Sequence, residues 1–144
     1  MKVFTIGFTQ KNAEQFFTRL KQPGLVRLVD IRLNNTSQLA GFTRRDDLKF
    51  FLRTILGIEY VYCPALAPTK EILNAYKRDG GDWAEYERRF LALMAQRQVE
   101  KKVAKGLIDG ACLLCSEATP EHCHRRLVAE YLRSHWGDLD IVHL

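Results

Sequence analysis

The stretch LVRLVDIR, residues 25–32, decides the fold class of this protein. It is rich in branched apolar residues with few polar interruptions, which is typical of a parallel strand covered by helices on both faces. Similar runs occur at residues 3–8, 58–66, 111–116 and 140–144, and segments with helical spacing separate them. Strands that alternate with helices predict a parallel sheet joined by right-handed crossovers.

The helical segments carry recognisable start and stop signals. Asn12 is typical of an N-cap, the segment 42–56 ends before Gly57, and the long segment 69–105 is interrupted at Gly80–Gly81. Asp82 is a plausible N-cap for the second half of that segment. In the last helical segment, Thr119 and Pro120 have the residue types preferred at the N-cap and first helical positions, so we expect that helix to begin there.

These patterns predict one α/β domain over residues 1–144, with three layers (α/β/α) and a mainly parallel sheet of about five strands. A chain of 144 residues is long enough to bury a core without disulfides or a structural metal. We find no internal repeat and no low-complexity linker.

The composition limits the compartment and the kind of partner. We see no signal peptide and no apolar run long enough to cross a membrane, and four cysteines without a secretory signal indicate reduced thiols in the cytoplasm. The formal net charge of +5 favours an anionic partner, either a small molecule or nucleic acid. The basic residues are dispersed among acidic ones, however, which is equally typical of solvated helix faces.

Ligands of open parallel sheets bind beyond the carboxyl ends of the strands. The segment CSEATPEHCHRR, residues 115–126, follows the fourth predicted strand and is rich in groups that take part in chemistry. Cys115 comes where that strand should end, and a thiol near a helix N-terminus and beside histidines and arginines should have a lowered pKa. We therefore regard Cys115, Glu117, Cys123, His124 and Arg125 as candidate site residues.

The two cysteines of ACLLC are expected to behave differently. Side chains three residues apart on a strand point to opposite faces, so Cys112 and Cys115 should not form a CxxC redox pair. Cys112 is expected to be a small buried apolar residue. Cys123 is open to two interpretations, a reactive thiol or an inert buried one, because its helical face also carries Leu127 and Tyr131.

Three specific mechanisms can be compared with the segment. A phosphatase-type loop needs an arginine six residues after its cysteine, and Glu121 occupies that position. A zinc site could use Cys115, Cys123 and a histidine, with Cys112 or Cys63 as the fourth ligand. An anion clamp would combine Arg125 or Arg126 with the helix N-terminus. The spacing excludes the first and leaves the other two open.

Asp30 and Arg32 form a second constellation at the end of the second predicted strand. Residues two apart on a strand share a face, so their side chains either bind a substrate or pair with each other and shape the loop at 34–37. Gly7, at the end of the first strand, is expected to allow a positive φ or a close approach of neighbouring atoms.

The chain resembles the DUF488 family of small bacterial and archaeal proteins. The resemblance rests on four blocks, which are TIG at 5–7, VDIR at 29–32, GIEY at 57–60 and CSEATPEHCHRRLVAEYL at 115–132. It implies a compact α/β domain and brings little mechanism, since the family is named for its lack of an assigned function. The family pattern points to Gly7, Asp30, Arg32, Tyr60, Cys115, Glu117, Pro120, Cys123, His124 and Arg125.

Two departures from the family pattern concern the expected site. Members commonly have a histidine after the first-strand glycine, where this chain has Phe8. Many members have Leu-Gly-Gly after the third strand, whereas this chain has ALAPT at 65–69. A site that needs that histidine as a base or ligand would be impaired here.

Three hypotheses of function follow. In the first, the protein is an enzyme in which Cys115 or Cys123 is the nucleophile or redox group, Glu117 or His124 transfers protons, and Arg32 and Arg125 bind an anionic, nucleotide-related or nucleic-acid substrate. Asp30, Tyr60 and Gly7 are also expected to contribute to substrate binding. In the second, the protein binds zinc or iron. In the third, it is a non-catalytic nucleic-acid-binding module. The sequence indicates no particular cofactor, substrate or oligomeric state.

Overall fold

The structure is a computed structural model that describes residues 1–36 and 40–144. Its centre is a sheet of five parallel strands, which are β1 (Lys2–Gly7), β2 (Arg27–Asp30), β3 (Glu59–Tyr62), β4 (Ala111–Cys115) and β5 (Asp140–His143). The strand order is β3-β2-β4-β1-β5, so β4 is inserted between the first two strands of the chain.

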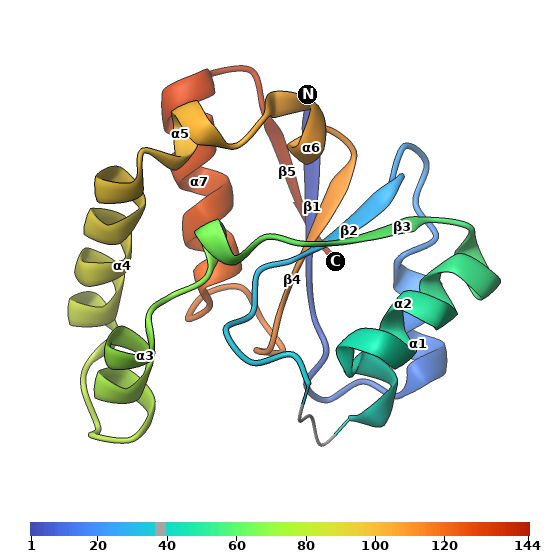
Figure 1. Ribbon diagram of the computed structural model, residues 1–144, viewed down its shortest axis with the longest axis horizontal. Coiled ribbons are helices and arrows are strands. Elements are labelled where there is room, and N and C mark those ends of the chain that lie inside the picture. The colour runs from blue at the N-terminus through green and yellow to red at the C-terminus, as the bar shows by residue number, and fades with distance from the viewer. Residues whose placement is uncertain (37–39) are drawn as a thin grey trace.

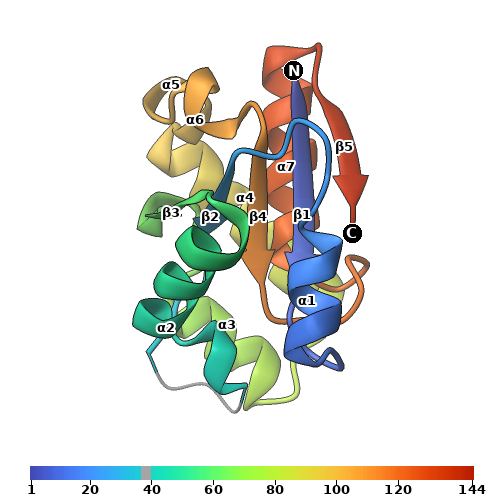
Figure 2. The same cartoon turned by 90° about the vertical axis from the view of Figure 1, so that its right-hand side faces the viewer.

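Helices cover both faces of this sheet (Figures 1 and 2). One face carries α1 (Ala13–Arg19) and α2 (Arg45–Phe51), which continues into a wider π-helical turn over Leu52–Leu56. The other carries α3 (Lys70–Lys77), α4 (Trp83–Arg97), α5 (Val99–Lys102), α6 (Lys105–Ile108) and α7 (His124–Trp136). Short 3-10 turns occur at Gly41–Thr43 and Pro64–Leu66. The predicted three-layer α/β/α class is confirmed.

The core is divided between the two faces because side chains alternate along each strand. Phe4, Ile6, Leu28 and Leu114 pack with the phenylalanines of α1, whereas Val29, Ile31 and Leu113 pack with the apolar residues of α4 and α7. Both clusters are buried. The near-continuous apolar character of the strands is therefore explained by burial on both sides.

The predicted helix signals were correct at three positions. Asn12 and Gln15 form a reciprocal capping box, Asp82 accepts a hydrogen bond from the Glu85 N–H, and Gly57 adopts a left-handed conformation at the end of the π-helical turn. Residues 37–39 of the Asn- and Ser-rich loop lie outside the described residues. Within the described part of the chain, no helix is both long and apolar enough to cross a bilayer.

The prediction that the last helix begins at Thr119 and Pro120 is wrong. Helix α7 begins at His124, and Cys123 is its N-cap with φ −140° and ψ 137°. Two carbonyl groups of the preceding loop accept hydrogen bonds from arginine side chains, Glu117 from Arg125 and Glu121 from Arg126. The Arg126 contact uses the Glu121 carbonyl, which lies inside the predicted helix, and residues 118–123 form bends and turns instead.

Candidate active site

The carboxyl end of β4 lies where the connections of the sheet diverge. The chain leaves β1 and β2 towards the face covered by α1 and α2, but it leaves β4 towards α7 on the opposite face. The connections that follow β1 and β2, the two neighbours of β4, therefore lie on the opposite face of the sheet from the connection that follows β4. Such a switch point is the usual place for a ligand in an open parallel sheet, and Cys115 is the last residue of β4.

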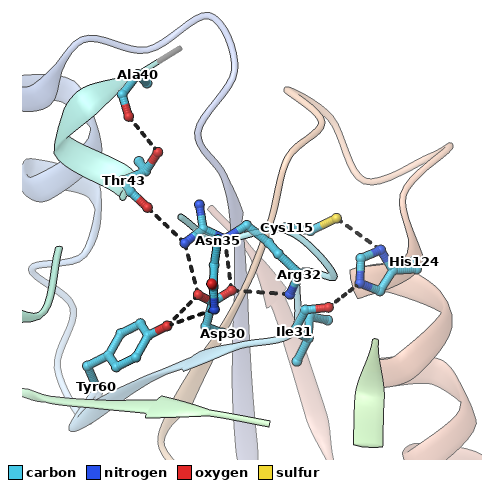
Figure 3. Close-up of polar contacts among 9 residues, drawn as sticks. All are labelled: Asp30, Ile31, Arg32, Asn35, Ala40, Thr43, Tyr60, Cys115 and His124. Atoms are coloured by element: carbon cyan, nitrogen blue, oxygen red, sulfur yellow. Dashed lines mark hydrogen bonds and ion pairs between the residues drawn. The ribbon is translucent and has the colours of Figure 1, made fainter. Parts of the chain in front are cut away.

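Cys115 and His124 form a hydrogen-bonded pair at this point (Figure 3). The Sγ atom of Cys115 lies 3.1 Å from Nδ1 of His124, and Nε2 of the same ring lies 2.7 Å from the Ile31 carbonyl oxygen. A carbonyl can only accept a hydrogen bond, so Nε2 carries a proton. In the neutral ring Nδ1 is then the acceptor, and it faces the thiol.

Cys123 completes a cluster with these two residues. The two Sγ atoms and a ring nitrogen of His124 all lie within 4.8 Å of one another. The Arg125 guanidinium also donates a hydrogen bond to the Cys123 sulfur at 3.4 Å. Because Cys123 is the N-cap of α7 and His124 its first residue, the start of one helix places both against the end of β4. We call Cys115, Cys123 and His124 the thiol cluster.

The two thiols of the cluster have opposite electrostatic preferences. Burial alone would raise the pKa of Cys115, but a hydrogen bond from the Cys123 thiol, backbone hydrogen bonds at Ser116 and Glu117 and the charge of Arg125 lower it overall. Burial and the hydrogen bond to Cys115 raise the pKa of Cys123 well above its usual value. Cys115 therefore loses its proton more easily than Cys123 does.

The thiol cluster lines a cavity of about 320 Å³. Four rings also contribute to its lining, those of Tyr76, Trp83, Tyr86 and His122. Trp83 stacks against His122 and Tyr86, with ring centroids 5.0 Å apart in each pair. The volume is at the lower end of the range for sites that bind small molecules.

Lys77 and Glu117 line the same cavity and form an ion pair between α3 and the loop after β4. The two side chains are partly exposed. Burial lowers the pKa of Lys77, but its hydrogen bond and ion pair with Glu117 outweigh this and raise the pKa overall. The carboxylate of Glu117 is thus committed to Lys77, whereas His124 contacts the Cys115 sulfur directly.

A second polar cluster, Asp30, Arg32 and Tyr60, lies beyond the carboxyl end of β2 (Figure 3). Arg32 binds the two carboxylate oxygens of Asp30 through Nε and Nη2, at 2.8 and 2.9 Å, and Nη2 also donates to the Thr43 carbonyl. The Tyr60 hydroxyl donates to Asp30 at 2.6 Å, and burial together with this bond raises the pKa of Tyr60. We call these three residues the carboxylate cluster. The mutual ion pair of Asp30 and Arg32 is present, and Arg32 also lines the cavity, so a part in substrate binding stays a prediction.

Gly7 and Arg125 hold the loop after β4 against β1. A Cβ atom on Gly7 would overlap the Glu117 carbonyl oxygen and would lie 2.6 Å from Nη1 of Arg125. That nitrogen donates to the Glu117 carbonyl at 2.6 Å, and Nε donates to the Thr5 hydroxyl at 3.3 Å. The glycine is therefore required by close packing, which is one of the two expected reasons.

The structure brings some of the predicted residues together and separates others. Cys115, Glu117, Cys123, His124 and Arg32 line the cavity. Asp30, Tyr60, Arg125 and Gly7 lie around it and contact other protein groups. Phe8 stands where the family commonly has a histidine, and the centroid of its ring lies 5.6 Å from the guanidinium carbon of Arg32. Cys112 is fully buried on the opposite face of β4 from Cys115, as predicted.

Sequence reasoning missed most of the cavity wall. Trp83 and Tyr86 have the spacing of an ordinary helix face, and nothing in the sequence marks Tyr76 or Lys77 as site residues. The Ile31 carbonyl that fixes the His124 ring is a backbone group, so no residue type could have revealed it. The stacking of His122 on Trp83 gave no signal either, because the two residues lie far apart in the chain.

Comparison with known proteins adds the family and little else. No curated protein and no solved structure matches the chain. The model of one family, described as "Domain of unknown function DUF488", matches residues 12–132, a span that contains the thiol cluster and the carboxylate cluster. Since this match covers most of the 144 residues, the chain belongs to the DUF488 family.

Proposed function

We propose that this protein is an enzyme that uses Cys115 as a nucleophile and His124 as its general base. One observation carries the proposal, which is the chain of contacts from the Cys115 sulfur to Nδ1 of His124 and from Nε2 to the Ile31 carbonyl, at 3.1 and 2.7 Å. A nucleophile, a base and a group that orients the base are the parts that thiol catalysis requires. The sulfur also lines a cavity in which a substrate would be held.

The reaction would proceed through a covalent intermediate. His124 accepts the thiol proton at Nδ1, and the thiolate forms a bond to an electrophilic centre of the substrate. The bond to the leaving group then breaks, and the leaving group takes the proton from His124. Backbone N–H groups at Ser116 and Glu117 lie beside the sulfur and stabilise the thiolate before it attacks. Water or a second substrate releases the product.

The cavity supports a small anionic substrate more than a polymer. A volume of about 320 Å³ suits one small molecule. Lys77 can exchange the Glu117 carboxylate for a carboxylate or phosphate of the substrate, since both residues line the cavity and their ion pair is partly exposed. The aromatic rings of Tyr76 and Trp83, which line the cavity, would contact a planar or nucleotide-related group. A reducing cytoplasm would keep the free thiol available.

Selective alkylation of the full-length protein tests the nucleophile. We expect substoichiometric iodoacetamide to label Cys115 first, because its pKa is lowered, and to leave Cys112 unlabelled, because it is fully buried. Peptide mapping by mass spectrometry gives the site. His124→Gln should slow the labelling about tenfold or more, and Cys112→Ser is the matched control. Equal labelling of all four cysteines, or a rate unaffected by His124→Gln, would contradict the proposal.

A screen for turnover tests the enzyme. Thioesters, esters and phosphorylated small molecules provide the anionic and electrophilic groups that the cavity supports. Any activity found should disappear in Cys115→Ser and persist in Cys63→Ser, since Cys63 lies after β3 and away from the cavity lining. Turnover that survives Cys115→Ser would rule out thiol chemistry.

The thiol cluster also favours a second candidate function, the binding of zinc or a similar metal. Two sulfurs and a ring nitrogen within 4.8 Å provide three ligands, and the Ile31 carbonyl fixes the far nitrogen of the ring, as a metal-binding histidine requires. Cys123 would have to lose its proton on binding. Untagged protein dialysed against zinc and analysed for metal decides the question. Stoichiometric zinc that is lost in Cys123→Ser supports it, and no retained metal excludes it.

A further inference from the structure

Cys123 has no part in the proposed catalytic step, although its sulfur lies next to the nucleophile. The Sγ atoms of Cys115 and Cys123 come from different elements, the end of β4 and the N-cap of α7, and lie within 4.8 Å of each other. Both thiols line the same cavity, so a small reagent that reaches one also reaches the other. Cys112 and Cys63 belong to the core clusters on opposite faces of the sheet.

We propose that Cys123 is a resolving thiol, so that a hydroperoxide converts Cys115 and Cys123 into a reversible disulfide. The disulfide would block the Cys115 sulfur and separate it from His124. Catalysis by Cys115 would then stop. This loss of activity is the only consequence that rests on the proposed function. Formation of the disulfide itself requires no substrate and no turnover.

The first step oxidises Cys115. Its thiolate attacks one oxygen of hydrogen peroxide, an S–O bond forms and the O–O bond breaks. The sulfur loses two electrons and becomes a sulfenic acid, and the peroxide is reduced to hydroxide, which becomes water on taking a proton. The thiolate is the reactive form in this step, and the contacts of Cys115 with Ser116, Glu117 and Cys123 favour it.

The second step uses Cys123. Its sulfur attacks the sulfenic sulfur of Cys115, an S–S bond forms and the S–O bond breaks. The departing hydroxide takes the Cys123 proton and leaves as water. Arg125, which already donates to the Cys123 sulfur at 3.4 Å, stabilises the charge that this sulfur acquires when it loses its proton. An external dithiol reverses the reaction by thiol–disulfide exchange.

The backbone around Cys123 permits the approach that a bond requires. A disulfide joins its sulfurs at about 2.0 Å, so the two atoms must move closer than in the reduced protein. Cys123 has extended φ and ψ values, and the preceding residues 117–122 form neither a helix nor a strand. Small rotations in this loop can therefore bring the sulfurs together without breaking a strand.

Peroxide treatment of the reduced, full-length protein tests the proposal. We expect hydrogen peroxide to produce a Cys115–Cys123 linkage, detected by non-reducing peptide mapping, and dithiothreitol to remove it. In Cys123→Ser, dimedone should trap a sulfenic acid at Cys115 with a yield about tenfold higher than in the unmodified protein. Cys112→Ser is the control, and its oxidation should match that of the unmodified protein.

The possible outcomes separate this proposal from the proposed function. A dimedone yield at Cys115 that is the same with and without Cys123, or a peroxide-treated protein that lacks the linkage, would overturn the role of Cys123. Selective alkylation of Cys115 could still succeed in that case, and the catalytic proposal would stand. Cys123→Ala serves as a second variant if the serine variant fails to fold, with circular dichroism as the check.

Discussion

Two buried polar clusters lie side by side at the carboxyl ends of neighbouring strands, and they differ in the hydrogen-bond partners of the Asp30 carboxylate and the Cys115 thiol. The carboxylate cluster lies at the end of β2 and the thiol cluster at the end of β4, and Figure 3 shows both except for Cys123. Their burial is nearly the same, since Asp30 and Arg32 are 0% and 2% exposed and Cys115 and His124 are 4% and 6% exposed. Burial therefore does not distinguish a structural cluster from a chemical one.

The hydrogen-bond partners make the distinction. Asp30 accepts from the Arg32 backbone N–H, the Arg32 guanidinium and the Tyr60 hydroxyl, so its oxygens are occupied by protein donors. Cys115 and His124 share a proton that can be transferred, and both face a cavity. We expect substitutions in the first cluster to affect stability, and substitutions in the second to affect reactivity.

The largest effect is expected for Asp30→Ala. Removal of the carboxylate leaves the buried Arg32 charge unpaired, which should lower the free energy of unfolding by about 3–5 kcal/mol. Urea denaturation measures this. Glu85→Gln, which removes an exposed ion pair with Arg88, is the control and should leave the midpoint almost unchanged. If the Asp30→Ala protein is as stable as the Glu85→Gln control, the carboxylate cluster has no structural role.

Gly7→Ala should have the next largest effect. The new methyl group would overlap the Glu117 carbonyl and push the loop away from β1, at a cost of about 2–3 kcal/mol. Gly106→Ala is the matched control, because a Cβ atom there meets no other heavy atom within 4 Å. Thermal unfolding compares the two variants. Equal stability would show that the loop after β4 can move at little cost.

Tyr60→Phe should cost less, about 1–2 kcal/mol. It removes one donor from the Asp30 carboxylate but leaves the ion pair with Arg32 in place. The side chain is half-buried, so water can replace part of the lost hydrogen bond. Chemical denaturation measures the difference from the unmodified protein. A loss as large as that of Asp30→Ala would mean that the phenol, and not the ion pair, holds the carboxylate cluster together.

Cys115→Ser should change stability by less than about 1 kcal/mol, although we expect it to abolish the fast alkylation. The serine hydroxyl is smaller and more polar than the thiol, and it can donate a hydrogen bond to Nδ1 of His124 in its place. Denaturation and alkylation measured on the same preparation test the contrast. Strong destabilisation would mean that the thiol cluster, like the carboxylate cluster, has a structural role.

The smallest effect is expected for the pH dependence of stability that arises from His143. It tests whether the Arg125 charge lies close enough to lower the pKa of this ring. The Thr5 hydroxyl accepts from Arg125 and lies at hydrogen-bond distance, 2.6 Å, from Nδ1 of His143, and burial and the charge of Arg125 lower the pKa of His143. The folded protein thus resists protonation of this ring. Stability should fall as the pH drops through the unfolded value near 6.5 towards the lower folded pKa.

NMR titration of the imidazole resonances gives the folded pKa of His143. Unfolding measured at pH 7 and pH 5.5 gives the pH dependence of stability, and His143→Gln should reduce it. A folded pKa at or above 6.5 would contradict the structural placement of Arg125 beside Thr5 and His143.

Much of the fold could be predicted because it depends on local patterns. The apolar run at 25–32 and its counterparts indicate strands covered on both faces, and Asn12 and Asp82 mark helix starts by their own side chains. The start of α7 was predicted wrongly for the opposite reason. Arg125 and Arg126 reach back to the loop carbonyls, and a side-chain contact of this kind overrides the local preference of Thr119 and Pro120.

The class of the fold, the positions of the strand ends and the residue types found there could all be predicted from the sequence. Periodicity and chain order carry that information, since each strand's end is a position in the chain. The contacts of these residues depend on the tertiary structure. The insertion of β4 between β2 and β1 sets Cys115 near Ile31, so that the His124 ring links the end of β4 to the residue that follows β2, while Asp30 pairs with Arg32 and Tyr60. Contacts between distant segments depend on strand order and packing, which no local pattern records.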